Sequence, residues 1–367
     1  MEHGAGPHRT RSPKETAIPK RPTSLTHSTA LALALLLTTA ACSTEDEGPR
    51  LGLDQPLPEE IPDGTTLAIG DPKTQRALEL SGEIDDLPFE AEWANMDGGP
   101  QTTEAFRADA LDVGAVADIP PLHARWTDLD VRVIAAAERQ DPLDHPLYEI
   151  GIAPGADVDE LSDIEGLRVA YSPGQAQGAL VLRLLDSVGL GQDDVELVEM
   201  TSVDDTYVQT LGSDEVDVAP LGGVQIRRYE ELYGQDGGTT LQHGLRDDPW
   251  HLYAPEEVLE DPAKAAALHA LVQAWARSTQ WISENPGEWA QGYYVEHEGL
   301  SADDAAYLVE RDGQAVVPTD WDDTIERHQQ TADLLSREQD WPEVDVREDV
   351  YDLRYESAAS EALGGDR

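Results

Sequence analysis

The sequence predicts an α/β protein with mostly parallel sheets, because short apolar strands alternate with amphipathic helices along the chain. The clearest unit is Phe89–Pro121, which contains a strand, a turn at Asp97–Pro100, a helix and a second strand at Val113–Val116. The helix carries its apolar residues on one face: Ala105, Phe106 and Ala108. Such a unit is a βαβ crossover with parallel strands, whose loops reach the carboxyl edge of the sheet, where open α/β folds bind ligands.

Three junctions between a strand and a helix lie on this predicted edge. The strand Leu67–Gly70 runs into Asp71-Pro72, which suits a helix cap and first turn, and the helix continues to about Ser81. The other junctions are Asn95–Gln101, with Gly98 and Gly99, and Ala117–Leu122, with Asp118 and Ile119. Helix amino termini present free N–H groups and partial positive charge, so three together form an anion receptor without a cationic side chain. Any one junction alone is better explained as an ordinary turn between strand and helix, but their succession on one edge favours a binding site.

The remaining elements continue the alternation. Further strands are expected at Val131–Ala137, Leu147–Ala153, Leu167–Tyr171, Val195–Val198, Glu215–Ala219 and Trp250–Tyr253. Further helices are expected at Ala176–Val188, Asp204–Leu211, Ala265–Ile282, Asn285–Ala290, Ser301–Val309 and Asp322–Leu335. In the second half of the chain, Ser172, Gly174 and Gln175 precede a helix, and Gly222 stands before another, so their backbone can approach a ligand.

Several short runs in this order resemble the solute-binding proteins of aliphatic-sulfonate, taurine and nitrate ABC importers, the NMT1/THI5-like family. They are Trp93-Ala94-Asn95, Gly98-Gly99-Pro100, Asp112-Val113-Gly114 and Asp118-Ile119-Pro120-Pro121. The resemblance extends from about Leu67 to about Tyr355. Gln175 and Ala176 stand where the family has small hydroxyl residues, and the aromatic and acidic residues that usually follow Glu215–Ala219 are absent, which leaves that wall of the pocket more open.

The resemblance implies a periplasmic-binding-protein-like fold of two lobes, each with a mixed, mostly parallel sheet flanked by helices and with the ligand cleft between them. Residues 64–140 and 248–356 would form lobe I, residues 141–247 lobe II, and residues 357–367 a tail. The chain would cross between lobes near Arg139–Pro146 and Gln242–Pro249, and hinge closure would report an occupied cleft to the permease. The expected ligand-binding residues are Asp71, Gly98, Gly99, Asp118, Ile119, Ser172, Gly174, Gln175 and Gly222. Asp118 is expected either to cap the helix that begins at Ile119 or to bind a ligand ammonium.

The composition is strongly acidic, with 74 Asp and Glu against 25 Lys and Arg and a formal net charge of -49. Phosphate backbones would be repelled, so nucleic acid is not an expected partner. A hydrophobic content of 40% with eight Trp indicates a packed core. Beyond the first 41 residues Lys73 and Lys264 are the only lysines, and such a surface suits concentrated salt, so we hypothesise a halophilic source.

The amino terminus predicts a lipoprotein. Residues 1–41 combine a basic region with the short apolar run Ala30–Leu37, as in a secretory signal peptide. Cys42, the only cysteine in the sequence, follows small residues as in a bacterial lipobox, with Thr39 where Leu is more usual. Its alternative is an ordinary cleavage site beside an incidental cysteine. Residues 42–63, acidic and rich in proline, are expected to be a tether that does not pack. The mature protein would be extracytoplasmic, held to the membrane by its lipid only, and monomeric.

No catalytic pattern stands out. The ten histidines form no H-x-x-x-H or H-E-x-x-H pattern, and no G-x-S-x-G or P-loop is present. We therefore expect no enzyme activity, no cofactor and no metal, and a small anionic or zwitterionic solute delivered to an ABC permease. A pyrimidine- or thiamine-precursor-binding protein, an enzyme of the same fold, and an extracellular adhesion protein remain as alternatives.

Overall fold

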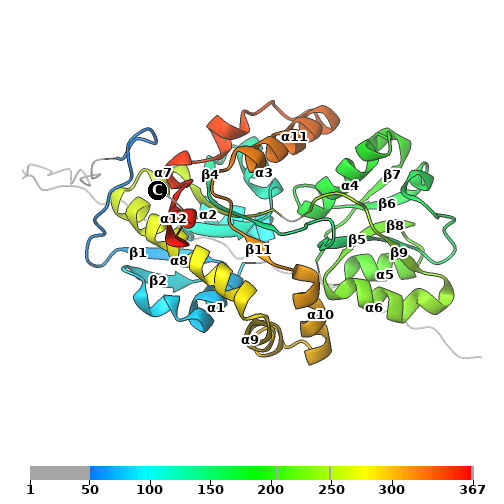
Figure 1. Ribbon diagram of the computed structural model, residues 1–367. Coiled ribbons are helices and arrows are strands. Elements are labelled where there is room, and N and C mark those ends of the chain that lie inside the picture. The colour runs from blue at the N-terminus through cyan, green and yellow to red at the C-terminus, as the bar shows by residue number, and fades with distance from the viewer. Residues whose placement is uncertain (1–49, 97, 204, 248, 365–367) are drawn as a thin grey trace, which may run out of the picture. The chain divides into compact units, whose positions relative to one another are not determined.

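Two β-sheets form the framework of the computed structural model, which describes residues 50–96, 98–203, 205–247 and 249–364 (Figure 1). The predicted signal peptide and Cys42 lie outside the described residues. The first sheet has the strand order β11-β4-β10-β3-β1-β2. Its strands are β1 (Thr66–Gly70), β2 (Glu90–Trp93), β3 (Val113–Val116), β4 (Val131–Arg139), β10 (Trp250–Pro255) and β11 (Ala315–Val316). The parallel crossover predicted at Phe89–Pro121 is present, with β2 and β3 on either side of β1.

The second sheet has the strand order β7-β6-β8-β5-β9 and uses the middle of the chain. Its strands are β5 (Tyr148–Ile152), β6 (Arg168–Tyr171), β7 (Glu196–Glu199), β8 (Val218–Gly222) and β9 (Thr239–Leu241). β6 is parallel to β7 and β8, whereas β5 is antiparallel to its neighbours β8 and β9. Both sheets are therefore mixed and parallel-rich, as predicted.

Helices cover both sheets. Around the first sheet lie α1 (Pro72–Ser81), α2 (Gly98–Arg107), α3 (Ile119–Trp126), α7 (Glu256–Leu259), α8 (Pro262–Glu284), α9 (Pro286–Trp289), α10 (Ala302–Asp312), α11 (Asp322–Gln339) and α12 (Ala358–Ala362). Around the second sheet lie α4 (Ala176–Ser187), α5 (Thr206–Gly212) and α6 (Val224–Tyr233). We call these two assemblies the first and the second lobe.

The apolar core reaches from one lobe into the other. One cluster joins strands of the first sheet to α8, to α11 and, through α4, to the second sheet. A second cluster lies on the other face of the second sheet, beneath α5 and α6. The helix α11 contacts α4, so the two lobes pack against each other at these helices.

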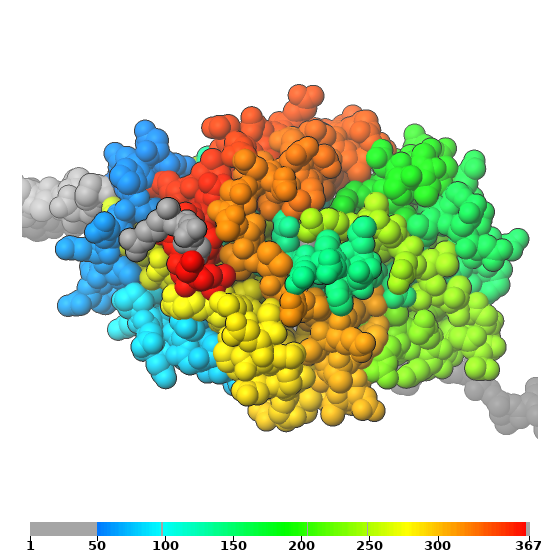
Figure 2. Space-filling view, in the orientation of Figure 1, coloured from blue at the N-terminus to red at the C-terminus, as the bar shows by residue number. Residues whose placement is uncertain are grey.

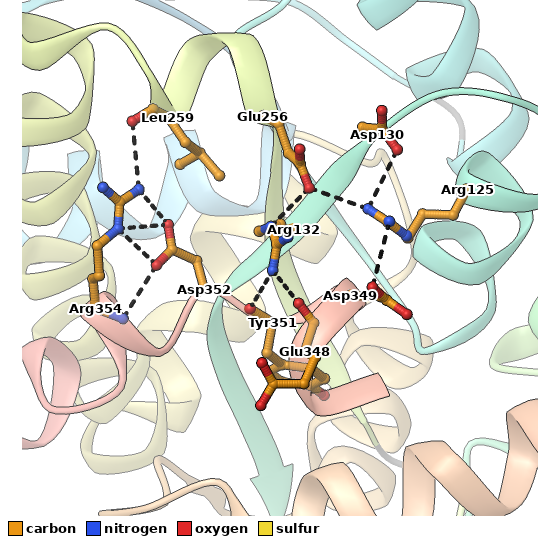
Figure 3. A network of polar contacts seen from close by, with 10 residues as sticks. All are labelled: Arg125, Asp130, Arg132, Glu256, Leu259, Glu348, Asp349, Tyr351, Asp352 and Arg354. Atoms are coloured by element: carbon orange, nitrogen blue, oxygen red, sulfur yellow. Dashed lines mark hydrogen bonds and ion pairs between the residues drawn. The ribbon is translucent and has the colours of Figure 1, made fainter. Parts of the chain in front are cut away.

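The C-terminal residues are fixed to the first sheet by a polar network (Figure 3). Arg132 of β4 donates to the Glu256 carboxylate at 2.8 Å and to the backbone carbonyls of Glu348 and Tyr351. Tyr351 also forms an isolated parallel bridge with Val133. These bonds explain why a segment without regular strands nevertheless packs against β4.

Three local predictions were wrong. Helix α2 already begins at Gly98, where a turn was expected, and its buried face is Gly99, Thr102, Thr103 and Phe106, while Ala108 is exposed. Strand β8 begins at Val218 and not at Glu215. The expected tether packs within its described part: the Leu51 N–H donates to the Glu260 carbonyl at 2.7 Å, and Leu53, Leu57 and Ile61 lie against the core. Its apolar residues outweigh the acidic, proline-rich composition.

Candidate functional site

The carboxyl edges of the two sheets face each other. The chain leaves the first sheet after β4 and enters the second at β5, then leaves after β9 and returns at β10. β4 is parallel to β1 and β3, so the chain departs from their carboxyl edge; β5 is antiparallel to β8, so it arrives at the carboxyl edge of β8. The loops that follow β1, β2, β3, β6 and β8 therefore border one cleft.

At the first junction Asp71 caps α1. Its carboxylate accepts bonds from the backbone N–H groups of Lys73 and Thr74 and from the Thr74 hydroxyl. Burial raises the pKa of Asp71, and the bonds from Thr74 act against this rise. The predicted cap is confirmed, and it turns the Asp71 carboxylate toward its own helix.

The next two helix starts lie against each other. Gly98 has φ +78°, a conformation that favours glycine, and a Cβ on Gly99 would come within 2.4 Å of the Pro120 side chain in α3. Ile119, the first residue of α3, is buried. The prediction that Asp118 caps α3 was wrong: its backbone is helical and its side chain accepts no capping bond. Asp118 instead lines a small polar cavity with His251 and His328.

The second lobe contributes the loop between β6 and α4. The Ser172 hydroxyl is buried without a hydrogen-bonding partner of regular geometry among the described residues. Gly174 has φ +71° and lies against the His123 ring of α3, so this loop touches the first lobe. The Gln175 carbonyl oxygen accepts a bond from the Ser202 hydroxyl at 3.0 Å, which occupies that side chain.

Three cavities follow the cleft. The first, of about 560 Å³, lies between Pro100 and Gln101 of α2 and the second-lobe residues that include Ser172 and Gln175. The second, of about 450 Å³, lies between Gly222 at the end of β8 and the first-lobe segment that contains Tyr293 and Leu308. The third, of about 260 Å³, lies at the base of the cleft, beside Lys73, Arg139 and Trp250. Its lining includes Leu147, which also lines the second cavity.

The predicted site residues are thus distributed along the cleft and do not meet in one pocket. The α2 junction and the loop at Ser172–Gln175 share the first cavity. Gly222 borders the second cavity, and the α1 junction reaches the third through Lys73. Asp118 stands apart in its own small cavity.

The side chain of Lys73 is a functional candidate that the sequence reasoning missed. It lines the third cavity, and its ammonium lies 4.5 Å from the centre of the Trp250 ring. The other lysine beyond the leader, Lys264, is paired with Asp112 at 2.6 Å. The scarcity of lysine was the available signal: one of two lysines stands directly after a strand end on the binding edge.

Titratable side chains also lie elsewhere in the described chain. Its His, Cys, Asp and Glu side chains include no group of three that could hold a metal ion. The rings of His251 and His328 stack with centroids 5.7 Å apart, and burial lowers both pKa values to about 4. Among the described residues no helix has both the length and the apolar character needed to span a membrane.

Comparisons with known proteins agree with this geometry. The family model described as NMT1/THI5 like matches residues 95–289. A candidate aliphatic sulfonates-binding protein of Escherichia coli (strain K12) is 28% identical over 112 residues, which is 30% of this chain and 34% of that protein. The match thus spans about a third of the length of this curated relative.

Solved structures share the fold over most of the chain. The periplasmic aliphatic sulphonate binding protein SsuA from Escherichia coli has a TM-score of 0.64 at 20% identity, covering 80% of this chain and 99% of its own. The alkanesulfonate-binding protein SsuA from Xanthomonas axonopodis pv. citri, bound to MOPS, has the same TM-score and coverage at 18% identity. The enzyme DszB, in complex with biphenyl-2-sulfinic acid, has a TM-score of 0.55 at 16% identity, covering 82% of this chain and 99% of its own. The fold is that of the periplasmic binding proteins.

Proposed function

Because the chain belongs to the NMT1/THI5-like family, we propose that it is the extracytoplasmic solute-binding component of an ABC importer. It binds a small anionic or zwitterionic organic solute of the sulfonate or taurine kind in the cleft and delivers it to the permease. The similar sulfonate-binding proteins support a binding role.

One observation carries the proposal: the helix starts of both lobes border cavities in a single cleft. The candidate contacts are the helix starts at Lys73, Gly98, Gly99 and Ile119, together with Ser172, Gly174 and Gly222. Backbone N–H groups at helix starts bind anions, each terminus contributing about 0.3–1 kcal/mol and more when partly buried. Screening in salt limits the repulsion from the acidic surface to about 8 Å, so short-range bonds in the cleft decide binding.

A thermal-shift screen with sulfonates, nitrate, bicarbonate and pyrimidines tests this function. We expect at least one small anion to raise the unfolding temperature in proportion to the logarithm of its concentration, because ligand binds only the folded state. Mass spectrometry of the recovered solute should find it unchanged. A chemically altered solute would favour an enzyme of this fold instead, because the enzyme DszB has a similar structure. A screen without any stabilising solute would contradict both functions.

We also propose that Cys42 carries the lipid anchor, with lobe I at residues 64–140 and 248–356 and lobe II at 141–247. Acyl chains contribute about 0.8 kcal/mol per buried CH₂ to membrane binding. Cys42→Ser should therefore move the protein from the membrane fraction to the medium, whereas Ser43→Ala should leave it in place. A Cys42→Ser protein that stays in the membrane fraction excludes the lipobox.

A further inference from the structure

The cavity at the base of the cleft combines an apolar wall with one lysine ammonium that forms no ion pair among the described residues. Its apolar lining comes from both lobes and from the returning crossing: Val116, Ala117, Ala137, Leu147, Pro249, Trp250 and Ile282. A volume of about 260 Å³ is at the small end of ligand pockets, which suits a solute of several carbon atoms.

The charged side chains on this lining are paired, with one exception. Glu138 accepts bonds from Arg246 and Arg327, and the Asp312 carboxylate accepts from Arg139 at 2.7 Å. Asp312 also accepts a bond from the Tyr294 hydroxyl at 2.5 Å. Both carboxylates are thus neutralised and offer little to a cationic ligand.

Lys73 is the exception. Among the described residues no carboxylate forms an ion pair with its ammonium, although the ammonium acts electrostatically on the Asp71 carboxylate, and it lies 4.5 Å from the centre of the Trp250 ring. This cation–π contact holds the ammonium in place but does not neutralise its charge. Trp250 is itself fixed edge-to-face by Trp275, with ring centroids 5.4 Å apart. The cavity therefore presents a positioned positive charge beside an apolar wall.

We propose that this cavity binds a monoanion with an apolar body, that Lys73 binds its anionic head, and that the site discriminates against zwitterions. The inference rests on the proposed function and names its substrate class: an alkyl or aryl group carrying a sulfonate or carboxylate, without an ammonium. An amine on the solute would lie beside Lys73, beside the apolar wall or beside Glu138 and Asp312, whose carboxylates are already paired with arginines.

Taurine and propane-1-sulfonate test the discrimination, because they share size and head group and differ by an ammonium in place of a methyl. Calorimetry on the wild-type protein should give at least tenfold tighter binding of propane-1-sulfonate, the ratio expected for an unpaired charged group in an apolar site. Equal or tighter binding of taurine would overturn the inference while leaving the solute-binding function intact. Binding of neither would overturn the inference, whereas the solute-binding function would then be decided by the thermal-shift screen with the other solutes.

Substitution of Lys73 tests the recognition residue. Lys73→Met keeps the apolar stem and should weaken propane-1-sulfonate binding by about 10- to 100-fold, as for loss of a charged hydrogen bond. Lys73→Arg should stay within a few fold of the wild type. Lys264→Met is the matched control, because Lys264 pairs with Asp112 away from the cleft. Wild-type affinity in Lys73→Met would overturn the role of Lys73, and if that variant does not fold, the Lys73→Arg protein and the wild-type ligand pair still decide.

Discussion

At the scale of single residues, the buried histidine pair predicts an acid-sensitive fold. His251 and His328 each lie within 3.2 Å of the Tyr351 hydroxyl, and burial lowers both pKa values from 6.5 to about 4. Nearby Asp118 and Glu138 act to raise that of His251. Between these pH values the unfolded chain binds more protons than the folded protein, so stability is complete above pH 6.5 and falls as the pH approaches 4. The loss is roughly 3 kcal/mol per histidine at about 1.4 kcal/mol per pKa unit.

Urea unfolding at a series of pH values measures this loss. A variant with both His251→Gln and His328→Gln should show a flatter dependence between about pH 4 and 6.5. The control is His297→Gln, because the His297 side chain is 42% exposed. If the free energy of unfolding has the same slope against pH in the wild type and the double variant, the two histidines are not the source of the acid sensitivity.

Asp118 gives a second prediction, because it neither caps α3 nor lines the cavity that contains Lys73. Asp118→Asn removes a negative charge near the cleft, so binding of propane-1-sulfonate should be preserved or tightened. An aminosulfonate that used Asp118 would instead lose affinity by about tenfold or more, the scale of a charged hydrogen bond. Calorimetry with propane-1-sulfonate and taurine separates these outcomes. If Asp118→Asn changes the affinity for neither ligand, Asp118 is not part of the binding site.

Asp71, Asp118 and Lys73 show which features of the site could be predicted from the sequence. Asp71 was predicted as a cap because Asp before Pro is a local signal, and local hydrogen bonds realise it. Asp118 before Ile119 and Pro120 gave a similar signal, but its helical backbone turns the carboxylate away from the N–H groups of α3. The position of Lys73 over Trp250 joins residues 177 positions apart, and no local pattern could predict it.

At the scale of elements, the loop between β6 and α4 contains a glycine with positive φ that also contacts the other lobe. Gly174→Ala would place a residue with a Cβ at φ +71°, which costs about 1–2 kcal/mol, with that Cβ 3.0 Å from the His123 ring. We expect the arrangement in which this loop touches α3 to be disfavoured, so solute affinity should fall in proportion to the population of that arrangement.

Gly189→Ala is the matched control for this loop. Gly189 follows the other end of α4 with φ +78°, and a Cβ there would meet nothing within 4 Å. Both variants should lose similar stability in thermal unfolding, but only Gly174→Ala should lose affinity in calorimetry. If both variants lose affinity equally, the cause is backbone strain at the ends of α4 and not the contact with His123.

Element types were predictable where periodicity and caps agree, whereas several boundaries were not. The paired glycines Gly98-Gly99 indicate a turn. In the structure Gly99 instead lies in the first turn of α2, where the helix packs so closely against Pro120 that a Cβ would not fit. The expected strand Glu215–Ala219 ended before Pro220, but β8 extends through this proline to Gly222. The strand continues because β8 pairs with β6 only at Val218, and Pro220 pairs with Ile150 of β5 alone.

At the scale of the whole described chain, polar contacts join the lobes in several places, and two of them lie on opposite flanks of the cleft. Arg311 of α10 donates to Glu149 of β5 at 2.9 Å, with side chains 13% and 15% exposed. Arg337 of α11 pairs with Asp186 of α4 at 2.7 Å, but these side chains are 57% and 59% exposed. Figure 2 shows the orange surface that contains both helices meeting the green surface of the second lobe.

The buried contact should control closure, and the exposed one should not. The Nε and Nη2 atoms of Arg311 are buried without partners among the described residues, so Glu149 supplies the one carboxylate that compensates its charge. Glu149→Gln would leave that charge uncompensated when the lobes are together, and breaking a buried pair costs about 3–5 kcal/mol.

Opening lets water solvate Arg311, so Glu149→Gln should shift the protein toward an open form, visible as a larger radius of gyration in X-ray scattering. Its solute affinity should fall tenfold or more, because the binding-competent closed form becomes rarer. Asp186→Asn breaks the exposed pair and should change affinity by less than about fivefold, since such pairs contribute 0–1 kcal/mol. Equal effects of the two substitutions would mean that burial at Arg311 does not govern closure.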